Sequence, residues 1–319
     1  MKKRFDYIDS VSGIMIVYMI SCHILQWSGY NVSNILLMRP LLCIFMPWFF
    51  FKSGMFHKNY TLRDVIKKNF KKLVIPFIVF SFIGYVIYCL NLYVDGDTNW
   101  IRYTLSPIKE FILIGAIYGN APLWFLLSLY LVKCISCLTL RGNIVITLIT
   151  MGFAIIIPIY IFPHINYPKF LGNVCIGYVF YSLGFYLKDK QFSIYVLLTS
   201  LVCYFTIFFL CYSNVDVNQS KLLDGNFFLW YIIAISGCVT INNIFYRYDI
   251  LNNKYLKNIG KNSMQYYVIH WPLLMIISML FKNHLDNNAY TAMLFVGCII
   301  SLPISSYLYN KFCNKYITL

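Results

Sequence analysis

The sequence predicts an all-α integral membrane protein, a polytopic bundle of about ten transmembrane helices. Of its 319 residues, 60% are hydrophobic and only 12% are charged, whereas a soluble domain carries about 25% charged residues. The mean hydropathy is +0.67. The apolar residues also gather into runs close to the ~20 residues that a helix needs to cross a bilayer. A disordered chain is excluded, because disorder needs low hydrophobicity and a high charge density.

Ten segments are apolar and long enough to be considered as spans. They are residues 8–27, 35–57, 73–94, 121–139, 143–162, 171–187, 192–212, 227–245, 263–281 and 291–309. Gly, Pro and Ser dilute the sixth and the tenth. No connection is long enough for a separate domain, and no internal repeat is visible. We therefore predict a single membrane-embedded domain over residues 1–319.

The first segment follows a basic start, as a signal peptide would. Asp6 and Asp9 interrupt it, and no small-residue cleavage site follows, so we expect an uncleaved first span. The connection 95–120 contains the apolar run Phe111-Ile112-Leu113-Ile114. It predicts a short helix, for which a position on the membrane surface is favoured and a re-entrant position is the alternative.

The distribution of Lys and Arg predicts the orientation. With the N-terminus inside, 18 of the 26 basic residues fall in inner segments and six in outer ones, which follows the positive-inside rule. We predict a multi-pass plasma-membrane protein with both termini in the cytoplasm. The net charge of +15 is then explained by topology. A nucleic-acid partner is not expected, because no gap can hold a binding domain.

Cysteine usage does not indicate a metal or redox site. Nearly all of the eleven cysteines lie inside predicted spans, where cysteine behaves as a small hydrophobic residue. Cys134 and Cys137 form a C-x-x-C pair, but no second pair and no histidine cluster accompanies them. We predict no bound metal.

Ionisable residues inside a membrane are functional candidates, because burying them is costly. His23 lies in the outer part of the first span, and Asp9 lies at its inner end. Fourteen residues of helix place the two about 21 Å apart, so they cannot touch. Catalysis and a structural hydrogen bond remain open for His23. His270 precedes Trp271-Pro272, and a structural role at the proline kink is favoured for it.

Lysines near the inner side allow two interpretations. Lys52 follows three phenylalanines in the second span, where extension to the headgroups is the usual behaviour and binding of a phosphate is the alternative. Residues 58–72 carry six basic residues. Anionic lipid explains most such runs, but the same cluster can receive the phosphates of a nucleotide.

Five motifs occur in order along most of the chain. They are Tyr7-Ile8-Asp9-Ser10-Val11-Ser12-Gly13-Ile14 leading to His23, Met46-Pro47-Trp48-Phe49-Phe50-Phe51-Lys52-Ser53-Gly54, KNFKKLVIP from Lys68 to Pro76, Pro122-Leu123-Trp124-Phe125-Leu126, and Ile259-Gly260-Lys261-Asn262-Ser263 through Tyr267 to His270. Together they resemble the integral membrane acyltransferase 3 family, in particular its shorter branch described as fucose 4-O-acetylase-like.

The resemblance implies ten spans and transfer of an acyl group, usually acetyl, from cytoplasmic acyl-CoA to a glycan hydroxyl across the membrane. It implies that His23 is the catalytic base, and we group Asp9 of the same motif with it. Many members carry an arginine eleven residues before the histidine, where this chain has Ser12. Lys52, Lys68 and Lys72 are possible substitutes for that charge.

The chemistry agrees with this assignment. A neutral histidine suits a base that removes a proton from an attacking hydroxyl near neutral pH. We therefore expect three groups of site residues: catalytic His23 and Asp9; acyl-CoA-binding Lys52, Lys68 and Lys72; and substrate-binding Trp124, Ser263 and His270. For Trp124, a place in the interfacial aromatic belt is the favoured alternative.

The predicted function is a membrane O-acyltransferase that uses acetyl-CoA as donor and a cell-surface polysaccharide, or its lipid-linked precursor, as acceptor. The bilayer, acyl-CoA and the glycan are the expected partners. A polysaccharide transporter or export component without chemistry is the main alternative, although the paired broken helices of many transporters are not visible. A purely structural membrane partner would leave His23 and the basic cluster unexplained.

Overall fold

The computed structural model describes residues 6–142, 144–164, 168–188, 193–248, 253–282 and 284–313. Within these ranges almost every element is a helix, and the one sheet has two strands. The protein is an all-α polytopic membrane bundle, as predicted. Lys2, Lys3, Arg4, Lys190 and Lys315, which contributed to the charge count, lie outside the described residues.

Eight helical segments of the described chain are long and apolar enough to cross a membrane, and they match eight of the ten predicted spans. They are α1 (Asp6–Trp27), Leu62–Val94 with α4 (Leu62–Asn69) and α5 (Ile75–Val94), Ala121–Thr139 with α8 (Trp124–Thr139), Ile144–Ile161 with α9 (Ile144–Ile156), α10 (Lys169–Leu187), α12 (Phe227–Arg247), α14 (Ser263–Phe281) and Asn287–Lys311 with α15 (Asn287–Leu308).

The two other predicted spans are shorter. The second is broken into α2 (Arg39–Leu42) and α3 (Phe45–Met55), and the seventh is α11 (Ile194–Leu210). Helix α3 lies in the centre of the bundle, and Trp48, Phe50 and Phe51 on it are fully buried. A Cβ atom added to Gly54 would collide with the backbone of Tyr181 on α10. The motif glycine is therefore needed for direct backbone contact between α3 and α10.

One end of the bundle is basic. It contains the start of α1, α4 and the short helix α13 (Lys254–Lys261). Lys257 forms an ion pair with Asp6, 3.2 Å from nitrogen to oxygen. A Cβ atom on Gly260 would collide with the backbone of Asp9, so this motif glycine lets α13 pack directly on α1.

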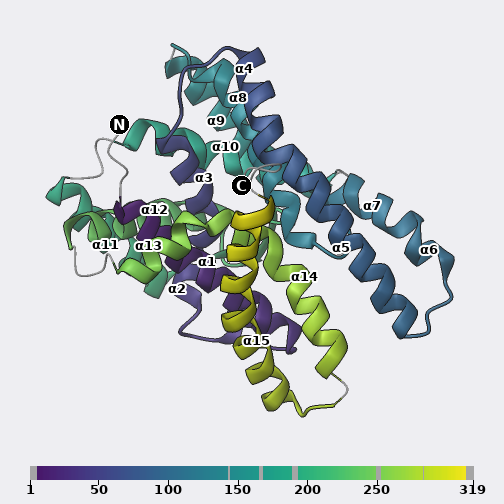
Figure 1. The fold of residues 1–319 in the computed structure, drawn as a ribbon. Coiled ribbons are helices and arrows are strands. Elements are labelled where there is room, and N and C mark those ends of the chain that lie inside the picture. Colours follow the sequence, from purple (N-terminus) through teal and green to yellow (C-terminus); the bar gives the residue numbers. More distant parts are fainter. Residues whose placement is uncertain are drawn as a thin grey trace.

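Helix α4 begins with a cap and continues into α5 through a wider turn. The Thr61 hydroxyl accepts from the Asp64 amide, which satisfies one of the free amides at the helix start. Residues 70–74 form a π turn directly before Pro76. Proline lacks the amide that would continue the hydrogen-bond ladder, and π turns accommodate such interruptions. Figure 1 shows α4 beside the C-terminal end of α8.

The connection between α5 and α8 contains α6 (Trp100–Tyr103) and α7 (Leu105–Ile114), which confirms the predicted short helix. Tyr85 of α5 donates to the carbonyl of Tyr103 at 2.6 Å. Further along, the Phe111 ring lies 6.0 Å from the ring of Phe77, two turns nearer the start of α5. Helix α7 thus runs back along α5 (Figure 1), and its position on or in the membrane stays a prediction.

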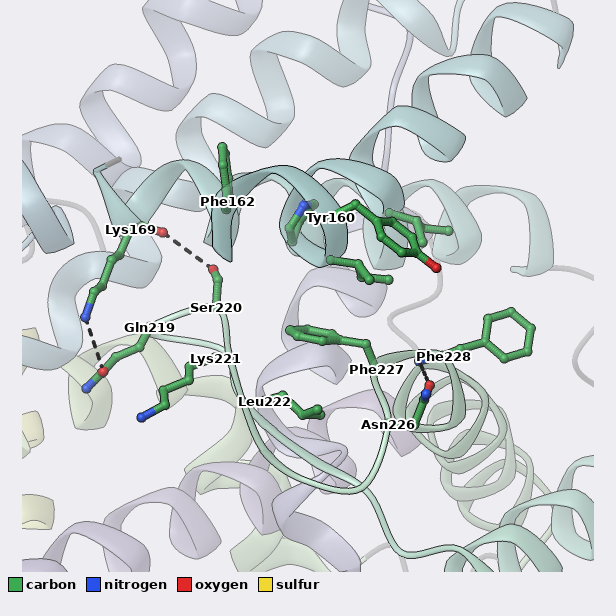
Figure 2. A pocket seen from close by; sticks show the side chains of 13 residues that line it. Tyr160, Phe162, Lys169, Gln219, Ser220, Lys221, Leu222, Asn226, Phe227 and Phe228 are labelled. Carbon is green, nitrogen blue, oxygen red and sulfur yellow. Dashed lines mark hydrogen bonds between the residues drawn. The ribbon is translucent and has the colours of Figure 1, made fainter. Parts of the chain in front are cut away.

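A β-hairpin closes the end of the bundle opposite to α4. Strands β1 (Asn214–Asp216) and β2 (Lys221–Asp224) pair antiparallel between α11 and α12. At its turn, Ser220 has a positive φ of 50°, and its hydroxyl donates to the Asn173 side-chain oxygen of α10 at 2.9 Å. Figure 2 shows the second contact of Ser220, with the Lys169 carbonyl. The sequence analysis did not predict this hairpin.

Candidate active site

His23 lines a cavity of about 330 Å³ near the hairpin end of the bundle, which we call the histidine cavity. Its walls come from α1, α3, the start of α8, the hairpin and α14. Its lining residues include Met19, His23, Gln26, Met46, Trp124, Asn214, Asp216, Asn218, Tyr267 and Trp271. Residues far apart in the sequence therefore meet around one imidazole.

The contacts of His23 define which nitrogen can accept a proton. Its Nδ1 lies 3.1 Å from Oε1 of Gln26, one turn further along α1. An amide oxygen only accepts hydrogen bonds, so Nδ1 carries the proton. The other nitrogen, Nε2, is then the one with a free lone pair, which is the form that a general base requires.

His270 packs against the face of the His23 ring and does not line the cavity. The two imidazole rings stack with centroids 5.3 Å apart, and the Trp271 ring meets His23 edge-on at 5.1 Å. His270 is fully buried and is not part of the cavity wall. Its Nδ1 lies 2.7 Å from the carbonyl of Tyr267. This arrangement holds the ring of His270 fixed and places a flat surface against His23.

The backbone carbonyl that Pro272 leaves without a donor in α14 is hydrogen-bonded by a residue other than His270. Pro272 cannot donate to the carbonyl four residues before it, which belongs to Val268. The buried side chain of Asn120 donates to that carbonyl at 3.0 Å. The hydroxyl of Tyr267 also bonds the Pro122 carbonyl in the same segment. The start of α8 is thereby attached to α14 beside the histidine pair.

A second cavity, of about 390 Å³, lies at the basic end and is called the lysine cavity. Five lysines line it: Lys52, Lys58, Lys68, Lys72 and Lys133. Among the described residues no Asp or Glu takes part in its wall. Lys68 and Lys72, which are one turn apart, face it together, whereas Lys67 and Lys71 do not. Such a concentration of positive charge attracts a polyanion.

Lys52 of α3 contacts Ser12 of α1, the position discussed in the sequence analysis. Its ammonium group donates to the Ser12 hydroxyl at 2.6 Å and lies 5.6 Å from the ring centre of Trp48. The lysine therefore points into the bundle and does not extend to the headgroups. A positive charge from α3 therefore stands beside Ser12 on α1.

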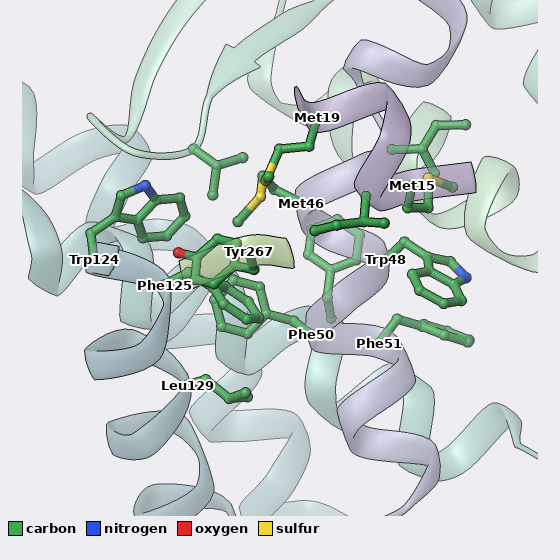
Figure 3. Packing of buried hydrophobic residues seen from close by; sticks show 14 of the residues in the cluster. Met15, Met19, Met46, Trp48, Phe50, Phe51, Trp124, Phe125, Leu129 and Tyr267 are labelled. Atoms are coloured by element: carbon green, nitrogen blue, oxygen red, sulfur yellow. The ribbon is translucent and has the colours of Figure 1, made fainter. Parts of the chain in front are cut away.

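A middle cavity of about 200 Å³ lies between the other two. Lys52 and Ser53 line both it and the lysine cavity, while Met19, Met46 and Tyr267 line both it and the histidine cavity. Figure 3 shows Met19 and Met46 between Trp124 and Trp48. Methionine side chains are flexible and can adapt their conformation to a bound ligand. The three cavities thus form a series from the lysines to His23.

The remaining predicted site residues are distributed unequally over this series. Ser263 lines the middle cavity. Trp124 is 5% exposed and lines the histidine cavity, so it is not part of a lipid-facing aromatic belt. Asp9 is buried under α13 and lines none of the three cavities. Its predicted catalytic role has no contact with His23 to support it.

The hairpin contributes polar groups that the sequence analysis missed. Asn214, Asp216 and Asn218 line the histidine cavity. Within the described chain, the side-chain oxygens of both asparagines are buried without a hydrogen-bond partner, and such groups are costly unless a ligand or water satisfies them. Burial raises the pKa of the Asp216 carboxyl, although amides of the turn oppose the shift. Only the alternation of polar residues within 213–220 hinted at this wall.

Comparison with known proteins agrees with this geometry. The model of the acyltransferase 3 family, which describes an acyltransferase domain, matches residues 5–310. No curated protein and no solved structure matches the chain. The match covers nearly the whole chain, including all three cavities. The protein therefore belongs to the acyltransferase 3 family and is a membrane acyltransferase.

Proposed function

We propose that the protein transfers an acyl group, most simply acetyl, from acyl-CoA at the basic end to a glycan hydroxyl in the histidine cavity. The basic end then lies on the cytoplasmic side of the plasma membrane, with both termini on that side. The fucose 4-O-acetylase-like branch remains part of this proposal. The acceptor is a cell-surface polysaccharide or its lipid-linked precursor.

One observation carries the proposal: three neighbouring cavities, which share lining residues, lead from five lysines to one histidine. The phosphates of acyl-CoA fit the lysine cavity, because several ammonium groups meet there without a competing carboxylate. From Ser12, beside Lys52, to His23 the helix rises about 16 Å. This length is comparable with an extended pantetheine arm, which would lie in the narrow middle cavity and bring the thioester to His23.

The proposed reaction needs one base and one leaving thiol. The glycan hydroxyl attacks the thioester carbonyl carbon while Nε2 of His23 takes the hydroxyl proton. The carbon–sulfur bond breaks, the new ester stays on the glycan, and the coenzyme leaves as a thiolate. The imidazolium of His23 returns its proton to that sulfur. His270 acts here as a positioning residue, because it contacts His23 and not the cavity.

The test is transfer of label from [acetyl-¹⁴C]acetyl-CoA into glycan by membranes that carry the protein. We expect His23→Ala to lower the rate by about 10²–10⁴-fold, the usual contribution of a general base. The matched control is His284→Ala, because His284 is exposed and lines none of the cavities. Expression and membrane insertion of both variants are compared by immunoblot of the membrane fraction.

The outcome also separates the enzyme from a non-catalytic export component. Covalent label in the glycan, lost with His23→Ala and kept with His284→Ala, supports the acyltransferase mechanism. Full incorporation by His23→Ala at equal expression would refute His23 as the base. Export of unlabelled glycan without any incorporation would favour the transport alternative.

A further inference from the structure

A fourth cavity lies on the other side of the hairpin from His23. It is the largest of the four, about 700 Å³, and we call it the hairpin cavity. The far end of the α9 segment, the start of α10, the hairpin and the start of α12 form its walls. It is separate from the path proposed for acyl-CoA, and nothing in the proposed reaction uses it.

One end of the hairpin cavity is cationic. Lys169 and Lys221 line it, and no Asp or Glu takes part in the described wall. Figure 2 shows the ends of both side chains gathered near Gln219, whose side-chain oxygen accepts from Lys169 at 3.4 Å. Burial raises the pKa of Asp216, on the histidine-cavity side of the hairpin, and the positive charges of both lysines oppose this shift. Lysines at this end of the bundle are few, so the positive-inside rule does not account for two that converge.

The other end of the hairpin cavity is apolar and aromatic. Tyr160, Phe227 and Phe228 line it, and Figure 2 shows them on the side away from the lysines. Tyr160 and Phe228 are more than 60% exposed. They lie at the ends of membrane-spanning segments, so their exposed faces meet lipid. The cavity therefore offers a charged pole beside the bundle and an apolar pole towards the bilayer.

The hairpin forms a wall of both this cavity and the histidine cavity. Gln219 lines both, and strand β1 carries Asn214 and Asp216 on the histidine-cavity side. A ligand with its phosphate at the two lysines can therefore extend a sugar past Gln219 towards His23. Its hydrocarbon tail would leave between the aromatic side chains into the membrane.

From this arrangement we propose that the hairpin cavity binds the phosphate group and the first part of the tail of a lipid-linked glycan, which is the acyl acceptor. The ligand class is a long-chain polyprenyl phosphate or diphosphate that carries sugar. This inference rests on the proposed function for the role of the sugar as acceptor. The binding site itself is defined by residues that the acyl-transfer reaction does not use.

The experiment measures binding of radiolabelled undecaprenyl diphosphate to the full-length protein in nanodiscs. In Lys169→Gln/Lys221→Gln we expect binding to weaken by about tenfold or more, because two charge-assisted contacts to phosphate are lost. The control Lys109→Gln/Lys282→Gln removes two lysines that line none of the four cavities. Phe228→Ala tests the apolar pole independently and should weaken binding about threefold or more.

Competitors distinguish the sources of the phosphate. Inorganic diphosphate should compete poorly, since it lacks a tail for the aromatic pole, and phosphatidylglycerol in excess should also compete poorly. Equal competition by inorganic diphosphate would mean a simple anion site, and equal competition by phosphatidylglycerol would mean a general lipid contact. Either result overturns the proposal, as does unchanged binding in the double lysine variant or in Phe228→Ala.

The result can be told apart from a failure of the proposed function. His23→Ala should bind the labelled lipid as the intact protein does, since His23 lines a different cavity. Normal acyl transfer by His23→Ala would contradict the reaction mechanism but leave the lipid result standing. Normal lipid binding by the double lysine variant, together with an inactive His23→Ala, would contradict only the present proposal.

Discussion

The lysine cavity and the histidine cavity lie on either side of the middle cavity and share lining residues with it, but they are built in different ways. The lysine cavity takes several of its charges from a short stretch of chain, including Lys58, Lys68 and Lys72. The histidine cavity takes its polar groups from α1, α14 and a hairpin that lies between α11 and α12. The first site is dominated by positive charge, whereas the second is shaped by aromatic rings, amides and the single carboxylate of Asp216.

This difference indicates where binding energy and precision are needed. A flexible lysine binds phosphate as a point charge, so several lysines on a surface helix tolerate small displacements. A base must lie within hydrogen-bond reach of its proton, so His23 is held by Gln26 and His270. We therefore expect variants at the lysine end to change the KM for acyl-CoA, and variants around His23 to change kcat or the use of the acceptor.

The largest effect in this comparison is expected at the lysine cavity. Lys68→Gln/Lys72→Gln should raise the KM for acyl-CoA about 100-fold, because each charged hydrogen bond to phosphate contributes roughly tenfold. The value of kcat should change little. Steady-state kinetics with purified protein at varied acyl-CoA concentration measures both constants.

The neighbouring lysines provide a control with the same change in charge. Lys67→Gln/Lys71→Gln alters the same helix, but neither residue lines the cavity. Its KM should stay within about twofold, apart from weak long-range electrostatics that salt screens. An equal rise of the KM for acyl-CoA in the two double variants would mean that these lysines act through net charge alone. It would contradict the binding of acyl-CoA in the lysine cavity.

At the other end, His270→Ala is expected to lower kcat by about tens of fold. The variant removes the ring stacked on His23, and a displacement of the base by about 1 Å is enough for an effect of this size. Asn at the same position can still donate to the Tyr267 carbonyl, which His270 contacts at 2.7 Å. Partial recovery of kcat by His270→Asn, with an unchanged KM for acyl-CoA, identifies a positioning role. A larger KM for acyl-CoA in both variants would contradict it.

Asp216→Asn tests the hairpin wall of the histidine cavity. Loss of a charged acceptor should raise the KM for the glycan about tenfold and leave the KM for acyl-CoA unchanged. Asp224→Asn is the control, because Asp224 is exposed on β2 and lines none of the cavities. An acceptor KM that stays constant in Asp216→Asn would remove the hairpin from substrate recognition.

The same variant has a defined dependence on pH. Burial raises the pKa of Asp216 above its ordinary value, so the ionised carboxylate costs folding free energy. That cost is fully present above the folded pKa and disappears as the pH falls below the ordinary value of about 3.9. Asp216→Asn should therefore raise Tm slightly at pH 7 and lose this advantage at acidic pH. The activity and the stability of this variant should change in opposite directions.

The sequence predicts the parts of the site that depend on local pattern. His23 stands out as an ionisable residue in an apolar span, and Lys68 and Lys72 share a helix face through their spacing. The partners of His23 depend on tertiary packing. Nothing in the spacing of α1 and α14 indicates that His23 and His270 stack. The hairpin was missed because its two strands are only three and four residues long.

Asn120 illustrates the same limit, and its substitution is expected to act on stability and not on catalysis. The sequence indicated correctly that Pro272 would free a carbonyl, but histidine is a natural neighbour in sequence and Asn120 a distant one. Asn120→Ala leaves the Val268 carbonyl without its donor and should cost about 1–3 kcal/mol. Tm should fall by several degrees, at about 2–4 °C per kcal/mol for a chain of this size.

Asn120→Asp keeps the shape of the side chain but cannot donate when ionised. A Tm equal to that of the intact protein in both variants would mean that the kink needs no external donor. A loss of stability with kcat retained would show that the attachment of α8 to α14 holds the bundle together without setting the geometry of His23.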